Sequence, residues 1–165
     1  QNQKVWTTMK LMGTNSNAFD AWLLHNGIKT LTLRMDKHCA NAMTIAEYLN
    51  SHKRIKKVNY PGLENNKYHA IAKTQMSQFG AMMSFEIDGG IEEAKQFMDK
   101  TQLCTIAATL GNVDTLLLHP ATASHLNIKK EIRDANGITD GLIRMSVGIE
   151  NVSDIIEDIE LGLGF

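Results

Sequence analysis

The sequence predicts an α+β fold in which helices cover one face of a sheet. The chain has 165 residues, of which 43% are hydrophobic and only two are proline, so it can bury a core of its own. Helix-like and strand-like segments both occur. The strands are separated by helices, but without the regular units of roughly 30 residues that repeated βαβ motifs require. These observations favour a two-layer α+β arrangement.

The first third of the chain is predicted to be helical. Apolar residues at helical spacing predict a helix over residues 4–12, which Gly13 ends. A second apolar segment starts at Ala18, and Asn26-Gly27 is a typical stop signal for it. Residues 30–51 contain neither proline nor glycine and repeat apolar residues at helical spacing, so they give the strongest helix signal in the chain.

The remainder alternates strand-like and helix-like segments. Short apolar or alternating runs bounded by glycine or proline predict strands at residues 55–60, 80–87, 103–111, 115–120 and 141–150. Amphipathic or polar runs between them predict helices at residues 67–77, 91–100, 126–135 and 152–163.

Composition excludes several classes of protein. The 17 basic and 18 acidic residues are spread along the chain, so no basic surface for nucleic acid or for an anionic membrane is expected. No apolar run approaches the roughly 20 residues of a membrane span, and no signal peptide is evident, which predicts a cytoplasmic protein. Cys39 and Cys104 lack metal-ligand spacing, so we expect buried free thiols and no metal site.

The segment "GLIRMSVGIE" at residues 141–150 contains a charge in an apolar strand. Arg144 is one of four arginines, against thirteen lysines, and the other three lie in polar segments where exposure is expected: Arg34, Arg54 and Arg133. A desolvated guanidinium costs several kcal/mol unless an anion meets it. Its planar fork suits a carboxylate held by two hydrogen bonds. From the residues alone, that carboxylate belongs either to a ligand or to one of the acidic residues of the chain.

Other candidate sites are weaker. The segment "IDGGIEEA" lacks the spacing of a phosphate-binding loop and predicts a tight turn instead. A hydrolase would have to use residues that are close only in sequence, and a catalytic triad is defined by geometry. Those residues are Asp114, His119, Ser124 and His125. The other histidines are expected to be partly exposed polar side chains: His25, His38, His52 and His69.

Several motifs, in order, resemble a known family. They are "NAFDAWLLHNGIKTLTLRMDKHCANAMTIAEYL", "VNYPGL", "FGAMMSFEI", "TLGNVDTLLLHPATASH" and "GITDGLIRMSVGIENVSDIIEDIE". Together they resemble the C-terminal portion of the Cys/Met-metabolism family of pyridoxal-phosphate (PLP) enzymes over nearly the whole chain. The resemblance implies the small C-terminal domain of a fold-type I PLP-dependent transferase, with a mostly antiparallel sheet, at residues 31–165. Residues 1–30 would be the tail of the large PLP-binding domain and connecting helices.

The resemblance also implies roles for particular residues. Arg144 stands where the family has the arginine that binds the α-carboxylate of the amino-acid substrate. Thr109 and Leu110 correspond to a serine-leucine pair on the carboxylate and cofactor side, so they are expected to take part in carboxylate binding. Ala108 and Ser124 are expected near the substrate. Thr109 and Ser124 both retain a hydroxyl group at these positions.

Two departures from the family pattern matter. Asn26-Gly27 replaces the arginine-glycine of many members, which removes any ionic contact made there. No lysine follows a threonine, as the Schiff-base lysine of the family motif would. We therefore expect that this chain has no catalytic residue of its own and holds no PLP covalently. It would then be an inactive C-terminal fragment, whose partner is the N-terminal PLP-binding part of the same protein.

The expected activity belongs to the full-length protein. Cystathionine γ-lyases have an acid where this chain has the apolar Ala108, so the resemblance favours methionine γ-lyase activity, a γ-elimination from methionine. Cystathionine γ-synthase or O-acetylhomoserine sulfhydrylase activity, a γ-replacement, is the alternative within the family. A non-catalytic binding or assembly domain is the alternative of another class. The expected partners are a small amino-acid substrate and identical subunits, since the family forms homotetramers.

Overall fold

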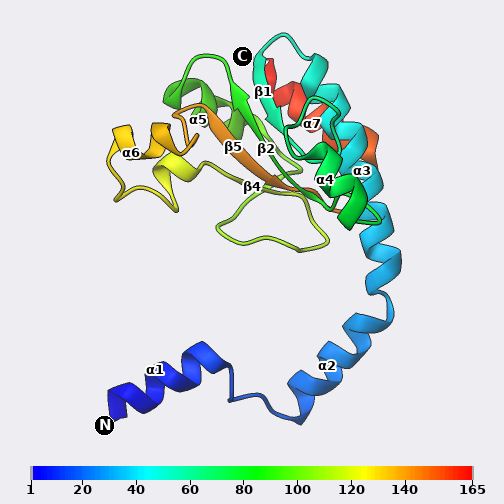
Figure 1. Cartoon of the computed structure of the whole chain (residues 1–165), viewed down its shortest axis with the longest axis vertical. Helices are drawn as coiled ribbons and strands as arrows, with labels where there is room; N and C mark the ends of the chain where they lie inside the picture. Colours follow the sequence, from blue (N-terminus) through cyan, green and yellow to red (C-terminus); the bar gives the residue numbers. More distant parts are fainter. Residues whose placement is uncertain (1, 165) are drawn as a thin grey trace. The chain divides into compact units, whose positions relative to one another are not determined.

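The computed structural model describes residues 2–164 and divides the chain into two compact units (Figure 1). The first unit extends to Leu33 and the second begins at Arg34. Helix α3 runs across this boundary. Within residues 2–164, no helix combines the length and apolar character needed to cross a membrane.

The first unit contains α1 (Asn2–Met12), α2 (Ala18–Lys29) and the start of α3. Asn17 caps α2, because its side chain accepts the backbone N–H of Phe19 and of Asp20 while the Asp20 carboxylate accepts the N–H of Asn17. The predicted stop at Asn26-Gly27 is wrong, since α2 continues beyond it. A glycine inside a helix costs only about 1 kcal/mol relative to alanine, which the flanking helical residues outweigh.

The second unit contains a five-stranded sheet in the order β1-β2-β5-β4-β3. The strands are β1 (Ile55–Asn59), β2 (Met82–Ile87), β3 (Thr105–Ile106), β4 (Leu116–Leu118) and β5 (Leu142–Ser146). Strands β1 and β2, β2 and β5, and β4 and β5 pair antiparallel, whereas β3 and β4 pair parallel. The predicted α+β class with a mostly antiparallel sheet is confirmed.

Six helical segments accompany the sheet. They are α3 (Leu31–Ser51), α4 (His69–Gln75), α5 (Ile91–Lys100), the 3-10 turn η1 (Pro120–Thr122), α6 (Lys130–Ala135) and α7 (Val152–Leu163). The helices predicted from the sequence are therefore present, several with shorter ends. The strand predicted at residues 103–111 is largely wrong, because only β3 is extended there and residues 108–111 form an exposed loop. That loop carries candidate site residues.

Three helices cover one face of the sheet, as predicted (Figure 1). Alternate residues of β2 and β5 enter the core with side chains of α3, α5 and α7, and the Phe85 and Phe97 rings meet edge to face at 5.6 Å. The buried residues of this layer include Ile45, Leu49, Met83, Phe85, Ile87, Phe97, Ile143, Met145, Ile155 and Ile159. Ser84, Arg144 and Ser146 alternate with these residues and lie on the opposite face.

Helix α7 carries a buried carboxylate. Asp158 accepts the backbone N–H of Gln102 at 2.6 Å and of Cys104 at 2.8 Å. Burial alone would raise the pKa of Asp158, but these N–H donors outweigh it and hold the pKa below its usual value. Burial, together with the neighbouring Asp158, raises the pKa of the Cys104 thiol. Cys104 and Cys39 are both buried and free, as predicted.

Two polar residues expected at the surface are buried. His38 is 4% exposed, with Nδ1 lying 2.6 Å from the Val147 carbonyl oxygen. Arg133 is 7% exposed, and its Nη2 donates to Asp140 at 2.9 Å. Helical patterns show polarity but not the partner that makes burial possible, which explains both errors.

Candidate functional site

Arg144 lies near the middle of β5, between Ser84 of β2 and Leu118 of β4. Its neighbours Ile143 and Met145 are fully buried in the core, whereas its own side chain is partly exposed on the other face. Strand alternation therefore accounts for a charge inside an apolar segment, because the charge and the apolar residues face opposite sides of one sheet.

The guanidinium of Arg144 is only partly satisfied. Its Nη2 donates to the Thr109 carbonyl oxygen at 2.7 Å, whereas its Nε is buried and has no hydrogen-bond partner. None of the ion pairs found within residues 2–164 includes Arg144. The described residues thus give no support to an internal salt bridge. A buried donor left unpaired costs about 1–3 kcal/mol, so an anionic acceptor here would be stabilising.

The loop between β3 and β4 brings the predicted residues to Arg144. Ala108, Thr109 and Leu110 are consecutive and exposed on this loop. The next residue, Gly111, has a φ of 81°, which favours glycine, and donates its N–H to Ser146 Oγ at 2.9 Å. The structure therefore places Thr109 directly against Arg144, and its chain neighbours Ala108 and Leu110 lie on the same loop.

Ser124 lies in a different segment, just after η1. Its exposed hydroxyl is 2.8 Å from His125 Nδ1, and the described hydrogen bonds do not connect it to Arg144. The hydrolase alternative gains nothing from the geometry. His119 is buried, with its ring nitrogens 2.9 Å from Thr122 Oγ1 and 2.8 Å from the Asp140 carbonyl oxygen, so it does not activate Ser124.

A hydrogen-bonded group behind the loop was not predicted from the sequence. The Glu150 carboxylate accepts two hydrogen bonds from Thr115, one from its backbone N–H and one from its side-chain hydroxyl. The Thr115 hydroxyl in turn accepts a hydrogen bond from the backbone N–H of Gly148. Asn41 of α3 donates to the carbonyl oxygens of Gly148 and Glu150 at 3.1 and 2.8 Å. Ser146, two residues after Arg144, was also missed, although strand alternation places both on one face.

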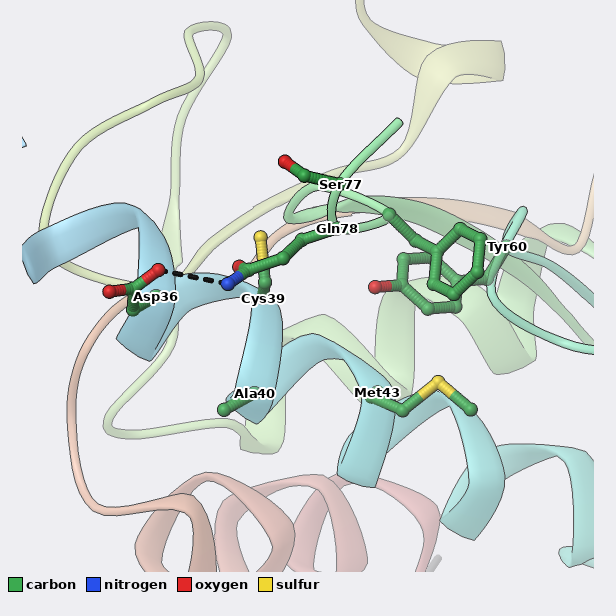
Figure 2. A pocket seen from close by; sticks show the side chains of 8 residues that line it. Asp36, Cys39, Ala40, Met43, Tyr60, Ser77 and Gln78 are labelled. Atoms are coloured by element: carbon green, nitrogen blue, oxygen red, sulfur yellow. Dashed lines mark hydrogen bonds between the residues drawn. The ribbon is translucent and has the colours of Figure 1, made fainter. Parts of the chain in front are cut away.

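A separate hollow of about 280 Å³ lies beside α3 and the segment that follows α4 (Figure 2). Gln78 Nε2 donates to Asp36 Oδ1 at 2.9 Å, and Cys39, Met43 and Tyr60 line the same hollow. Tyr60 donates its hydroxyl to the Gly80 carbonyl oxygen at 2.8 Å, and burial raises its pKa to about 12. None of the predicted site residues lines this hollow.

The chemistry of the Arg144 face suits an anion. The groups gathered there are a guanidinium, the Ser146 hydroxyl and the backbone of the loop. A guanidinium with free donors matches the planar geometry of a carboxylate.

Comparisons with known proteins identify the family of the chain. The family model described as "Cys/Met metabolism PLP-dependent enzyme" matches residues 1–164. An L-methionine gamma-lyase of Fusobacterium nucleatum subsp. polymorphum is 51% identical over 144 residues, covering 87% of this chain and 36% of the relative. A cystathionine beta-lyase of Coxiella burnetii is 43% identical over 152 residues, covering 92% of this chain and 39% of the relative.

A solved structure matches the fold closely. The cystathionine gamma-lyase from Lactobacillus plantarum, complexed with L-serine, superposes with a TM-score of 0.86 at 40% identity. The match covers 99% of this chain and 42% of that protein. The chain thus spans well under half of the length of these relatives.

Proposed function

The chain belongs to the Cys/Met metabolism family of PLP-dependent enzymes, and from that premise we propose that it is the substrate-carboxylate-binding C-terminal part of a longer carbon–sulfur lyase. The observation that carries the proposal is Arg144. It is a partly satisfied guanidinium on the face of the sheet away from the helices, with a buried, unpaired Nε and no ion pair among residues 2–164.

In this proposal each site residue has a distinct task. Arg144 binds the α-carboxylate of an amino acid through the donors that Thr109 leaves free, and so fixes the direction of the Cα–H bond. The Thr109 carbonyl holds the guanidinium plane, while Leu110 and Ala108 border the substrate. Ser124 contributes a hydroxyl near the substrate once the full-length protein is assembled. PLP, which the rest of that protein would hold, would supply the electron sink.

The first unit fits the role of a segment that packs against more protein. Helices α1 and α2 have no buried residue, and large apolar side chains are exposed along both. They include Trp6, Phe19, Trp22, Leu24 and Ile28. Such an apolar surface normally marks an interface. We assign residues 1–30 to the large PLP-binding domain and residues 31–165 to the small domain, in a protein that assembles as a homotetramer.

Methionine γ-lyase activity is the favoured reaction. A relative with that name is 51% identical to the chain, and the methyl side chain of Ala108 suits a methylthio group better than a charged one. The relative named cystathionine beta-lyase, at 43%, keeps other thioether substrates open. Release of methanethiol with an α-keto acid would identify γ-elimination, whereas a new thioether would identify γ-replacement. Absence of both in the full-length protein would favour a non-catalytic domain.

The test is Arg144→Lys in the full-length protein, assayed with methionine. A lysine keeps the positive charge but lacks the two parallel N–H donors of a guanidinium. We therefore expect KM to rise about 10- to 100-fold, with a smaller loss of turnover. Arg54→Lys, at the outer end of the sheet, is the matched control and should leave both constants unchanged. Unchanged kinetics together with a lower melting temperature would show that Arg144 has only a structural role.

A further inference from the structure

The loop that borders Arg144 is tied to β5 at two alternate positions. Arg144 Nη2 donates to the Thr109 carbonyl oxygen at 2.7 Å, and Gly111 donates its N–H to Ser146 Oγ at 2.9 Å. Arg144 and Ser146 are two residues apart on the strand, and Thr109 and Gly111 are two residues apart on the loop. The strand and the loop therefore run side by side here, joined through side chains rather than through a ladder of backbone bonds.

Ser146 is placed where its hydroxyl has little access to water. It is 2% exposed and lies between Met82 of β2 and Leu116 of β4 in the sheet register. A buried hydroxyl needs a protein partner, and the Gly111 N–H is the partner that it has. Gly111 itself is exposed, so loss of this acceptor would leave its N–H to bond to water and would release the middle of the loop from β5.

Apart from these two bonds, the hydrogen bonds described for residues 2–164 hold the loop at its ends. The Ala107 N–H bonds to the Leu117 carbonyl oxygen at one end, and the Val113 carbonyl oxygen accepts the Ile149 N–H at the other. Between these ends, the bonds to Arg144 and Ser146 are the hydrogen bonds that connect the described loop to the sheet. If the substrate carboxylate competes with Thr109 for the guanidinium, only the Ser146 bond continues to fix the middle of the loop.

We propose that Ser146 is a positioning residue for the carboxylate site, an inference that rests on the role proposed above for Arg144. Its hydroxyl fixes the Gly111 N–H and so sets the distance of the Thr109–Gly111 backbone from the guanidinium. Ser146 does not touch the substrate. Its effect is to keep the loop in place while Arg144 exchanges a backbone carbonyl for a carboxylate, so it acts on recognition of the carboxylate more than on turnover.

The experiment compares methionine with methioninamide as substrates of the full-length protein. The amide lacks the anionic carboxylate, so the ratio of the two kcat/KM values measures carboxylate recognition separately from general activity. Ser146→Ala should lower this ratio about five- to tenfold, mainly through a higher KM for methionine. It should also speed hydrogen–deuterium exchange of peptides that cover residues 107–112, a readout that needs no turnover.

Two further variants make the test specific. Ser146→Thr retains the hydroxyl on a β-branched side chain, which strands generally favour, and should keep both the ratio and the protection of the loop. Ser84→Ala removes a hydroxyl on the same face, directly across from Arg144, but that hydroxyl accepts from Asn59 rather than from the loop. The ratio should therefore stay unchanged in Ser84→Ala.

The outcomes separate this inference from the proposed function. An unchanged ratio in Arg144→Lys would refute the carboxylate role of Arg144 itself. A lower ratio in Arg144→Lys with no change in Ser146→Ala, and with the loop still protected, would overturn only the role of Ser146. An effect of Ser84→Ala equal to that of Ser146→Ala would overturn it as well. Should Ser146→Ala not fold, Ser146→Cys, with a weaker acceptor of similar size, must lower the ratio for the inference to stand.

Discussion

The Glu150 carboxylate holds Thr115 through two hydrogen bonds, accepting the backbone N–H at 2.5 Å and the hydroxyl at 2.9 Å. Glu150 follows β5, which carries Arg144, and Thr115 ends the loop that carries Thr109. One acidic side chain therefore fixes the strand and the loop of the candidate site relative to each other. The same clamp also aligns Gly148, whose N–H bonds to the Thr115 hydroxyl at 2.9 Å.

Glu150→Gln should weaken this clamp. The amide oxygen can still accept the Thr115 N–H, but the amide nitrogen is a donor, so the Thr115 hydroxyl loses the acceptor of its proton. We expect the free energy of unfolding to fall by about 1–2 kcal/mol, measured by urea denaturation. Glu157→Gln, on the exposed side of α7, should change it by less than about 0.5 kcal/mol. Equal effects of the two variants would contradict the clamp.

Gly148→Ala tests how closely the loop approaches the strand. A Cβ at Gly148 would overlap the Val113 carbonyl oxygen and lie 2.6 Å from the Asp114 carbonyl carbon, both of which are backbone atoms. Backbone cannot rotate away as a side chain can, so we expect a loss of about 1–3 kcal/mol of stability. The matched control is Gly27→Ala in α2, where a Cβ meets no atom within 4 Å. A melting temperature unchanged in Gly148→Ala would show that the loop can move aside.

The elements of the fold were largely predictable because each has a local pattern. The apolar residues of β2 and of α7 recur at spacings that identify strand and helix without any tertiary contact. The 103–111 segment was misassigned because its small apolar residues suit a strand in composition. Its actual conformation depends on side-chain bonds from β5, which lie far away in sequence.

The candidate site was predictable only in part. Arg144 stood out because a charge interrupts an apolar strand, and its resemblance to a family motif gave the charge a role. The hydrogen bond between Thr115 and Glu150 joins residues 35 positions apart, and the bond from Asn41 to the Glu150 carbonyl oxygen joins residues 109 positions apart. Neither contact therefore leaves a local pattern in the sequence. His38 was expected at the surface for the same reason, since its acceptor, the Val147 carbonyl, is 109 residues away.

Asp158 should make stability sensitive to acid. Its pKa is held below the unfolded value by backbone N–H donors of Gln102, Cys104 and Leu103, which overcome the opposing effect of burial. A lowered folded-state pKa means that the ionised form stabilises the fold. That stabilisation is fully present above the unfolded pKa of about 3.9 and is lost as pH falls through the folded value.

Asp158→Asn is the corresponding variant. It replaces an acceptor oxygen with an amide that faces backbone N–H donors, so we expect a loss of about 1–3 kcal/mol at neutral pH. The difference from the wild type should shrink as pH falls below about 4, where the unfolded carboxylate takes up its proton, and should be lost as pH falls through the lower folded pKa. Asp99→Asn, on the exposed surface of α5, should cost less than about 0.5 kcal/mol. A difference independent of pH would contradict the role of the charge.

Ala108→Glu should change substrate preference in the full-length protein. Ala108 is exposed on the loop next to Thr109, whose carbonyl contacts Arg144. In the proposed site, a carboxylate added there faces the distal end of the amino acid that Arg144 binds. The added carboxylate would attract the distal ammonium group of cystathionine. Methionine has no distal charge, so the added side chain would affect it only through its size. We expect kcat/KM for cystathionine relative to methionine to rise about tenfold. Ala108→Gln adds the same bulk without charge, and an equal shift in that variant would attribute the effect to size alone.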